Sequence, residues 1–459
     1  MKVVMCAAEM VPFSKVGGLA DVLGALPVAL EKQGCQVVVV VPGYKDEGSA
    51  GIKIESLSPD ISVANIGKAT KVYFVESKKF FDRDGIYGDV DQDYKDNLDR
   101  FLYYSRRTIA LLKEIDFQPE IIHLHDWHTC LIAIFLKELY AREEFFKQAK
   151  TVLTIHNVVY QGQFPKQEFP KLGLPERLLG PGGLEFDGRL NLLKGGIEYC
   201  DAISTVSATY SREIQTEEYG AGLAEVLKKH RSSLIGILNG VDYSIWDPKN
   251  DKYIASTYLS DNLEGKSKDK EDLQRACGLN IRADLPLFGM VSRLTGQKGI
   301  DLLIKAIDQI CGMDLQLVVL GMPELNYYPV LEKLAKRYPG KFCLRPGFDN
   351  PLSHKVYAGS DLFLMPSKYE PCGLSQLISF RYGTLPLVFK TGGLADTVSP
   401  ENGFVFDRYD QEGLVEAIQR AISAYADKPG WETLVKKVMK YDFSWDEAAR
   451  QYLELYERV

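Results

Sequence analysis

The sequence predicts an α/β protein with two doubly wound parallel-sheet domains. In the first half, short β-branched runs alternate with longer helical patterns, which is typical of a parallel sheet covered by helices. A charged stretch at 248–286 interrupts this alternation, which then resumes. We therefore expect an N-terminal domain over residues 1–247, a C-terminal domain over 248–440, and a C-terminal helix over 441–459 that packs back on the first domain.

Strands are expected where a short apolar run lies between turn residues or helical patterns. In the first half these runs are Val3 to Ala8, Cys35 to Val41, Lys71 to Val75, Ile121 to Leu124, Thr151 to Ile155, Ala202 to Val206 and Leu234 to Ile237. In the second half they are Leu287 to Val291, Leu315 to Leu320, Phe342 to Arg345, Leu362 to Met365, Leu385 to Phe389 and Gly403 to Phe406.

Two helical segments and one charged segment complete the expected elements. A helix is expected from Trp127 to Phe146. The C-terminal helix has one apolar face, because its aromatic and alanine residues recur at helical spacing. The run KSKDKED at 266–272 is expected to be a solvated helix face or a loop between the domains. The apolar face of the last helix consists of Trp445, Ala449, Tyr452 and Tyr456.

The composition excludes several classes of protein. The chain has 459 residues, 46% of them hydrophobic and 25% charged, which is ordinary for a soluble globular protein with sizeable cores. The net charge of −7 gives no basic excess for nucleic acid or an anionic membrane. The eight cysteines include no C-x-x-C pair, so we expect them to be reduced and structural. The first strand follows Met1 and Lys2 directly, so the cytosol is expected, or the plastid stroma if a transit peptide was removed.

A glycine turn opens the first helical segment. The sequence KVGGLADV at 15–22 follows the first strand, so backbone N–H groups, a positive helix end and the Lys15 charge meet at one anion-binding point. The related KTGGLADTV at 390–398 also follows a strand, and two such turns could bind one ligand across a cleft. Either glycine pair could instead serve only a tight turn and close helix packing. Gly17, Gly18 and Leu19 do not match G-x-G-x-x-G, which disfavours a nicotinamide dehydrogenase.

Polar residues follow two other strands of the first half. HLHDWH at 123–128 contains metal-ligand types, but a helix starts within it and the set need not converge, so hydrogen bonding at a strand end is preferred. His156 and Asn157 follow the next strand. A polar pair at the end of a buried strand suits a hydroxyl-rich ligand, although a capping role for Asn157 is the plain alternative.

Two loops of the second half carry charged residues at strand ends. In SRLTGQKG at 292–299, Arg293 and Lys298 can reach a diphosphate, with solvated surface cations as the alternative. In PSKYEPCGLSQ at 366–376, Glu370 precedes a helix expected near Leu374. There it can bind sugar hydroxyls, or it can simply favour the helix N-terminus.

These motifs, in this order and together with NGVD at 239–242 and WDP at 246–248, resemble the bacterial glycogen synthase and plant starch synthase family. The resemblance covers the chain from Met1 to about Tyr409. It implies the GT-B fold, in which two Rossmann-like domains face each other across a deep cleft. It also implies transfer of glucose from ADP-glucose to the non-reducing end of an α-1,4-glucan with retention of configuration.

The resemblance also assigns roles to residues. No metal or other cofactor is expected, because two cations and a helix N-terminus would neutralise the leaving diphosphate. The catalytic residues would be Asp126, His156, Arg293, Lys298 and Glu370. The donor-binding residues would be Lys15, Gly17, Gly18, Asn157, Asn239, Phe348, Cys372, Gly373, Leu374, Ser375 and Thr391.

Two alternatives to the glucan synthase stay open. One is another nucleotide-sugar enzyme with the same two-domain frame, such as a sucrose-type transferase or an epimerase. Many transferases of this fold have a second glutamate eight residues after the first, but this chain has Ile378 there, which disfavours the sucrose type. The other alternative is a non-catalytic glucan-binding relative. A glycogen phosphorylase is disfavoured by length alone.

Overall fold

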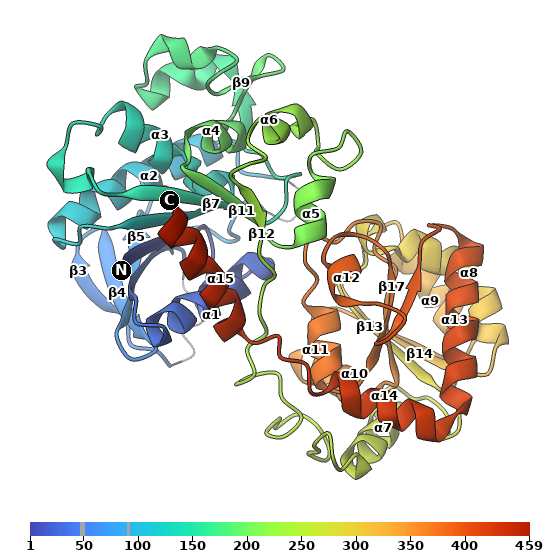
Figure 1. Ribbon diagram of the computed structural model, residues 1–459. Coiled ribbons are helices and arrows are strands. Elements are labelled where there is room, and N and C mark those ends of the chain that lie inside the picture. Colours follow the sequence, from blue (N-terminus) through green and yellow to red (C-terminus); the bar gives the residue numbers. More distant parts are fainter. Residues whose placement is uncertain (46–50, 90–91) are drawn as a thin grey trace. The chain divides into compact units, whose positions relative to one another are not determined.

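The computed structural model describes residues 1–45, 51–89 and 92–459. Contacts divide the chain into two compact units (Figure 1). Unit 1 comprises Met1–Gly240 and Trp445–Val459, and unit 2 comprises Val241–Ser444. The junctions expected from the sequence, 247/248 and 440/441, lie a few residues from these. Within the described ranges, no helix is both long and apolar enough to cross a membrane.

Unit 1 contains a nine-stranded sheet with the order β12-β11-β7-β6-β1-β2-β5-β4-β3. Its strands are parallel except for the antiparallel pairs β3/β4 and β4/β5 at one edge. A second sheet has the order β8-β10-β9. The strands of unit 1 are β1 Lys2–Cys6, β2 Gln36–Gly43, β3 Glu55–Ser58, β4 Ile61–Ile66, β5 Thr70–Glu76, β6 Ile121–His125, β7 Lys150–Ile155, β8 Gln163–Pro165, β9 Glu185–Phe186, β10 Arg189–Asn191, β11 Ala202–Thr205 and β12 Leu234–Gly236.

Helices cover both faces of the large sheet, with α1 and α15 on one face and α2, α3 and α4 on the other (Figure 1). The α-helices of unit 1 are α1 Gly18–Lys32, α2 Asn97–Glu114, α3 Cys130–Glu138, α4 Leu192–Tyr199, α5 Ala208–Glu213, α6 Ala224–Lys229 and α15 Trp445–Arg458. Its short 3-10 helices are η1 Trp127–Thr129, η2 Glu144–Phe146, η3 Lys166–Leu172 and η4 Glu176–Leu179.

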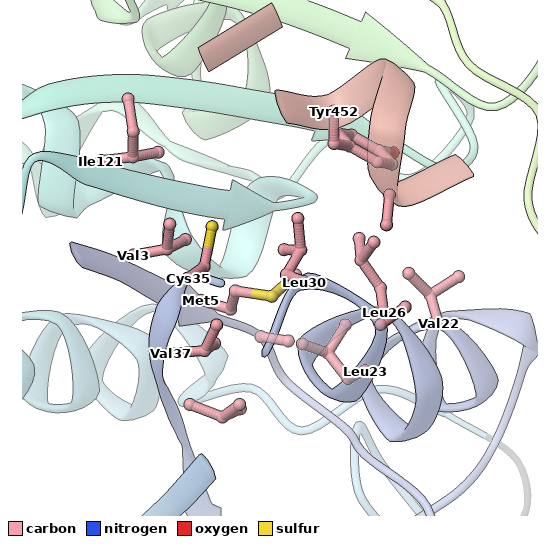
Figure 2. Close-up of a cluster of buried hydrophobic side chains, with 14 of the residues drawn as sticks. Val3, Met5, Val22, Leu23, Leu26, Leu30, Cys35, Val37, Ile121 and Tyr452 are labelled. Carbon is pink, nitrogen blue, oxygen red and sulfur yellow. The ribbon is translucent and has the colours of Figure 1, made fainter. Parts of the chain in front are cut away.

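The core of unit 1 lies between the sheet and the pair α1 and α15 (Figure 2). Tyr452 of α15 and Leu26 of α1 close over Met5 of β1, and all three side chains are fully buried. Each such side chain contributes about 1.5–3 kcal/mol when it is removed from water. The predicted apolar face of the last helix is confirmed, because its four residues are all buried in this core. The last helix therefore belongs to the same unit as the first strand.

Unit 2 contains a six-stranded parallel sheet with the order β15-β14-β13-β16-β17-β18. Counted from its own first strand this is 3-2-1-4-5-6, the order of a Rossmann domain. Its strands are β13 Leu287–Val291, β14 Gln316–Gly321, β15 Phe342–Pro346, β16 Leu362–Met365, β17 Leu385–Phe389 and β18 Phe404–Phe406. Its helices are α7 Glu264–Ala276, η5 Gly296–Lys298, α8 Ile300–Gly312, α9 Tyr328–Arg337, α10 Asn350–Gly359, α11 Ser375–Arg381, α12 Gly392–Thr397, α13 Gln411–Ala426 and α14 Lys428–Val438.

Every apolar run that the sequence predicts as a strand forms one, so the doubly wound α/β class is confirmed. The sequence misses β3, β4 and the small sheet β8-β10-β9. The helix expected from Trp127 to Phe146 is wrong in length, because α3 ends at Glu138. Side chains 130–136 are all buried whereas Leu139 is 45% exposed, so the buried face of the helix has ended by then.

The expectation of a solvated segment at 266–272 is wrong for three of its residues. All three lie in α7, which packs on α10; Asp269 and Lys270 are buried and Lys266 is half-buried. The Lys266 Nζ donates to the carbonyl oxygens of Ala358, Ser360 and Tyr382 at 2.9–3.0 Å. The Lys270 Nζ lies 2.7 Å from the Asp361 carboxylate. Buried charges are tolerated where every donor is paired, and burial still lowers the pKa of Lys266 to about 8.

Both large sheets have a topological switch point, where ligands bind in open α/β sheets. In unit 2 it lies between β13 and β16, whose next strands in sequence lie on opposite sides. In unit 1 it lies between β1 and β6. The loops that leave these four strands are the motif loops of the sequence.

Candidate active site

The glycine turn of unit 1 is occupied by groups of the protein itself. Gly17 is the N-cap of α1 and Gly18 its first residue. The backbone N–H groups of Val16 and Gly17 both donate to Oε2 of Glu9, the second at 3.2 Å. Lys15 forms an ion pair with Asp21 at 2.7 Å. Two of the N–H groups expected to face an anion are therefore already bonded to a carboxylate.

Packing does not explain the glycines of this turn. A Cβ at Gly18 would have no atom within 4 Å, and a Cβ at Gly17 would lie 3.6 Å from Glu9 Oε1. The φ angle of Gly17 is −140°, which other residues adopt readily. The absence of side chains at Gly17 and Gly18 therefore leaves space in which a ligand can approach the backbone closely.

Asp126 and His156 meet where β6 and β7 end. The Asp126 carboxylate accepts the backbone N–H of His156 at 2.7 Å. Asp126 is buried and has a φ of 56°, a backbone conformation that is costly for a residue with a side chain. Burial raises the pKa of its carboxyl to about 7, although the N–H of His156 opposes the shift. Asn157 Oδ1 accepts the N–H of Val159 at 3.1 Å, a local bond of the capping kind.

The histidines of 123–128 point to different partners. His123 bonds to the Tyr456 hydroxyl at 2.8 Å, His125 bonds to His156 at 2.9 Å, and His128 stacks on Trp127. Among the residues that the structure describes, no three His, Cys, Asp or Glu side chains are grouped so that they could hold a metal ion. His123 and His125 thus form hydrogen bonds at the end of β6, whereas His128 only stacks on Trp127.

The switch point of unit 2 brings two predicted residues into contact. Lys298 of η5, after β13, lies 2.5 Å from Oε2 of Glu370, which follows β16. Ser367 donates to the same oxygen at 3.0 Å. The two loops are joined because Lys368 N donates to Gln297 O at 2.9 Å. Glu370 is buried, and its carboxylate is bound by one cation and one hydroxyl. A carboxylate can accept more hydrogen bonds than these two, so it can also accept from a ligand.

The second glycine turn packs on the Glu370 loop. The N–H of Gly393 donates to the carbonyl of Glu370 at 3.0 Å. A Cβ at Gly392 would lie 1.9 Å from that carbonyl oxygen, and one at Gly393 would lie 2.0 Å from the carbonyl oxygen of Cys372. Thr391, the N-cap of α12, is buried beside them. Packing alone therefore requires both glycines here.

The other predicted residues of unit 2 lie around these loops. Gly373 has a φ of 73°, so the turn before α11 needs a glycine. Leu374 is the N-cap of α11 and Ser375 its first residue. Arg293 is exposed and forms no ion pair with any described residue. Phe348 follows β15 and is 85% exposed, far more than an aromatic ring usually is.

The buried amide oxygen of Asn239, in unit 1, has no hydrogen-bond partner among the described residues. An unpaired buried acceptor requires an explanation, and a bound ligand is one.

Sequence reasoning missed Glu9 and Tyr87. Burial raises the pKa of Glu9 to about 7, although the N–H groups of Val16 and Gly17 oppose the shift. Burial raises the pKa of the Tyr87 hydroxyl far above the usual range, and the nearby carboxylate of Glu9 adds to the shift. The glutamate in AAEMVP at 7–12 was a visible signal, since a lone carboxylate there follows a fully apolar strand.

The fold and these strand-end sites define a glycosyltransferase of the GT-B class. Residues 2–229 match the starch synthase catalytic domain, and residues 277–431 match the glycosyl transferases group 1. The chain belongs to the glycogen synthase and starch synthase family. It is 44% identical to a glycogen synthase of Geotalea daltonii, with 100% of this chain and 99% of the relative covered. It is 43% identical to a glycogen synthase of Geotalea uraniireducens, with coverage of 99% and 98%.

Solved structures agree with this assignment. The catalytic domain of starch synthase IV from Arabidopsis thaliana, bound to ADP and acarbose, has a TM-score of 0.89 and 35% identity, with 99% of this chain and 98% of that chain covered. A sucrose-phosphate synthase from Thermosynechococcus elongatus has a TM-score of 0.63 and 19% identity, with 100% and 98% covered. The second likeness concerns the fold alone.

Proposed function

We propose that this glycosyltransferase transfers glucose from ADP-glucose to the non-reducing end of an α-1,4-glucan, with retention and without a metal. The observation that carries the proposal is the contact of Lys298 with Glu370 at the switch point of unit 2. It places a cation for phosphate and a carboxylate for hydroxyls side by side, which a nucleotide-sugar needs at the bond that breaks.

Lys298 and Arg293 have separate parts in this proposal. Lys298 exchanges part of its contact with Glu370 for a phosphate oxygen when the donor binds. The exposed guanidinium of Arg293 binds the diphosphate in a bidentate manner. Glu370 then accepts hydrogen bonds from glucose hydroxyls, since its two oxygens offer more acceptor sites than Lys298 and Ser367 use.

The residues of unit 1 would act by position and charge. His156 and Asp126 lie together after two adjacent strands and would line the glucose. We propose attack on the same face of the sugar as the leaving group, with a diphosphate oxygen accepting the proton of the acceptor hydroxyl. The positive charge that develops at the reacting carbon would be stabilised by this preorganised site rather than by a covalent intermediate.

Two findings support the choice of substrates. The starch synthase IV structure was bound to ADP and to acarbose, which supports an adenine nucleotide and a glucan. The similar glycogen synthases come from bacteria, which supports glycogen as the product and a bacterial cytoplasm as the location.

Initial rates test the proposal. The protein is incubated with ADP-glucose or UDP-glucose, carrying labelled glucose, and with glycogen or maltotetraose. We expect faster transfer from ADP-glucose, a product from which an α-1,4-specific amylase releases the added label, and the same rate in excess EDTA. A β-linked product, or activity that EDTA abolishes and magnesium restores, would overturn the mechanism. Label released as free glucose only would overturn the synthase activity itself.

A further inference from the structure

Two cysteines of unit 2 lie where the end of α7 runs beside β15. Cys277 is the C-cap of α7, and Cys343 is the second residue of β15, which is an edge strand of the sheet. Both are free thiols. Each is 8% exposed, whereas Cys6 and Cys130 in unit 1 are fully buried. The pair in unit 2 therefore keeps some contact with solvent.

Cys343 points toward the end of α7. Alternate residues of a strand point to the same face, so Cys343 and Arg345 share one face of β15. Arg345 Nη2 donates to the carbonyl of Ala276, the last residue of α7, so this face of the strand is turned toward the end of the helix. Cys277 is the next residue after that carbonyl. The two thiols are close enough for each to shift the pKa of the other.

Hydrogen bonds join the same two segments on the other side of the pair. Asn280 N donates to the Gly340 carbonyl at 3.1 Å. The side chain of Gln316, in β14, donates to the carbonyls of both, at 2.7 Å to Asn280 and at 3.1 Å to Gly340. Segments 276–280 and 340–345 are thus joined on both sides of the cysteines. These contacts hold the two thiols near each other in the folded protein.

The two thiols differ in reactivity. The neighbouring Cys277 is the largest cause that lowers the pKa of Cys343; burial opposes the shift, and the guanidinium of Arg345 supports it. The pKa of Cys277 is raised, first by Cys343 and then by burial. The thiolate is the nucleophilic form of cysteine. Cys343 is therefore the thiol that reacts first, and Cys277 is the thiol that stays protonated beside it.

We propose that Cys277 and Cys343 form a redox modification site, which hydrogen peroxide converts into a reversible disulfide. The Cys343 thiolate attacks one peroxide oxygen and breaks the O–O bond, which gives a sulfenic acid and hydroxide. The hydroxide takes up the proton that Cys343 lost and leaves as water. The Cys277 sulfur then attacks the sulfenic sulfur, forms the S–S bond and releases a second water. Two thiols are oxidised and one peroxide is reduced, and a dithiol reductant reverses the change.

The disulfide links the edge strand to α7 covalently. The elements β13, α8, β14 and α9 lie between the two cysteines in the sequence, so the crosslink closes a long loop. Closing a long loop restricts the unfolded chain, so oxidation stabilises unit 2. This modification goes beyond the proposed function and does not depend on it, since thiols, crosslinks and stability are measured without any sugar substrate.

Oxidation of the wild-type protein tests the proposal. The folded protein is treated with hydrogen peroxide, alkylated, and digested without reductant for mass spectrometry. We expect the loss of two of the eight thiols, a crosslinked peptide pair that contains Cys277 and Cys343, and a rise of the thermal midpoint by about 5 °C or more. Dithiothreitol should restore the thiols and the midpoint. A protein that keeps all eight thiols, or whose crosslink joins other cysteines, would overturn the proposal.

Single substitutions separate the roles of the two thiols. Cys277→Ser removes the second thiol, so peroxide should leave a sulfenic acid on Cys343 that dimedone traps. Cys343→Ser removes the reactive thiol, so Cys277 should stay reduced at the same dose. Arg345→Gln should slow the crosslinking about tenfold, because the guanidinium no longer favours the thiolate. Cys311→Ser, in α8 of the same unit, is the control and should form the disulfide as the wild type does.

The outcome of these variants is decisive for the order of the steps. If Cys277 in the Cys343→Ser variant is oxidised as fast as Cys343 in the Cys277→Ser variant, Cys343 is not the reactive thiol and the proposed site is wrong. If a variant does not fold, the peptide map of the wild type still decides whether the pair forms a disulfide. A correct disulfide in a protein without glucosyl transfer would overturn the proposed function alone.

Discussion

The two glycine turns share the pattern K-x-G-G-L but differ in what requires their glycines. At 390–394, both glycines lie against backbone carbonyls, so any side chain would collide with them. At 15–19, a Cβ at Gly18 would meet nothing within 4 Å. Packing within the protein thus requires the two glycines of the second turn, whereas it does not require those of the first turn.

The partners of the turn N–H groups differ as well. In unit 1, two of them donate to the carboxylate of Glu9. In unit 2, Gly393 donates to the uncharged carbonyl of Glu370. A repeated motif is therefore weak evidence for a repeated role, and of these two turns only the first has room for a Cβ at its second glycine.

The largest effect is expected at the second turn. Gly393→Ala would place a methyl group 2.0 Å from the carbonyl oxygen of Cys372, so the backbone must shift. We expect unit 2 to lose about 3 kcal/mol or more of stability, measured by urea unfolding. Gly312→Ala, at an open position in the same unit, is the control and should change stability by less than about 1 kcal/mol. A wild-type midpoint for Gly393→Ala would show that packing does not select this glycine.

The next largest effect distinguishes the role of the Glu370 side chain from the role of its backbone carbonyl. Glu370→Ala keeps the carbonyl that supports Gly393 but removes the carboxylate that neutralises Lys298. We expect kcat to fall by about two orders of magnitude, because a polar contact to the transition state is lost. ADP lacks glucose and the freed Lys298 can bind phosphate, so ADP affinity should stay within a few-fold or rise.

Calorimetric titration with ADP and steady-state rates decide this prediction, with Arg293→Ala as the matched variant. Arg293→Ala should weaken ADP binding as well as slow turnover, since its guanidinium is expected to bind phosphate. If Glu370→Ala loses ADP binding yet keeps its turnover at saturating donor, the assignment of Glu370 to the sugar is wrong.

A smaller effect is expected at the first turn. Gly18→Ala has room for its methyl group in the free protein, so stability should stay within about 1 kcal/mol of the wild type. If the donor approaches this turn, the methyl group displaces it and kcat/KM falls about tenfold. Gly182→Ala, also open and also in unit 1, controls for the loss of a glycine. Equal kcat/KM for the two variants would remove Gly18 from the donor site.

The sequence predicts the buried parts of the fold better than its edges. All thirteen predicted strands exist, because buried parallel strands need continuous apolar runs. The edge strand β3, with the sequence ESLS, is mostly exposed and so has no apolar signal. The sequence also gives no sign that Lys266 is half-buried and hydrogen-bonded, since the carbonyls around it come from residues 358–382, about a hundred positions away in sequence.

The candidate site was likewise only partly predictable from the sequence. The contact of Lys298 with Glu370 follows from a rule, because loops after neighbouring parallel strands meet at one edge of a sheet. The contact of Glu9 with the first turn follows from no such rule. It depends on how residues 7–17 fold back on themselves, which alternation and spacing do not encode.

The smallest effect concerns pH and again separates the two turns. Burial raises the pKa of Glu9 to about 7 from an ordinary value of 4.5. Between these values the folded protein holds a proton that the unfolded chain has lost, so this group makes stability fall as pH rises from about 4.5 to 7. The second turn has a carbonyl in the corresponding place and adds no such dependence.

Glu9→Gln should remove this contribution, since an amide oxygen can still accept from Val16 and Gly17 but does not titrate. We expect the stability of the variant to fall less than that of the wild type between pH 5 and pH 8, by on the order of 1 kcal/mol. Asp126, whose pKa is also raised to about 7, adds a fall of the same sign to both proteins. The charge of Glu9 contributes to that raised pKa, so the difference between the two curves measures Glu9 together with its interaction with Asp126. Urea unfolding at four pH values measures it. Parallel curves would mean that Glu9 is ionised across this range, and the first turn would then bind a permanent negative charge of its own in place of a phosphate.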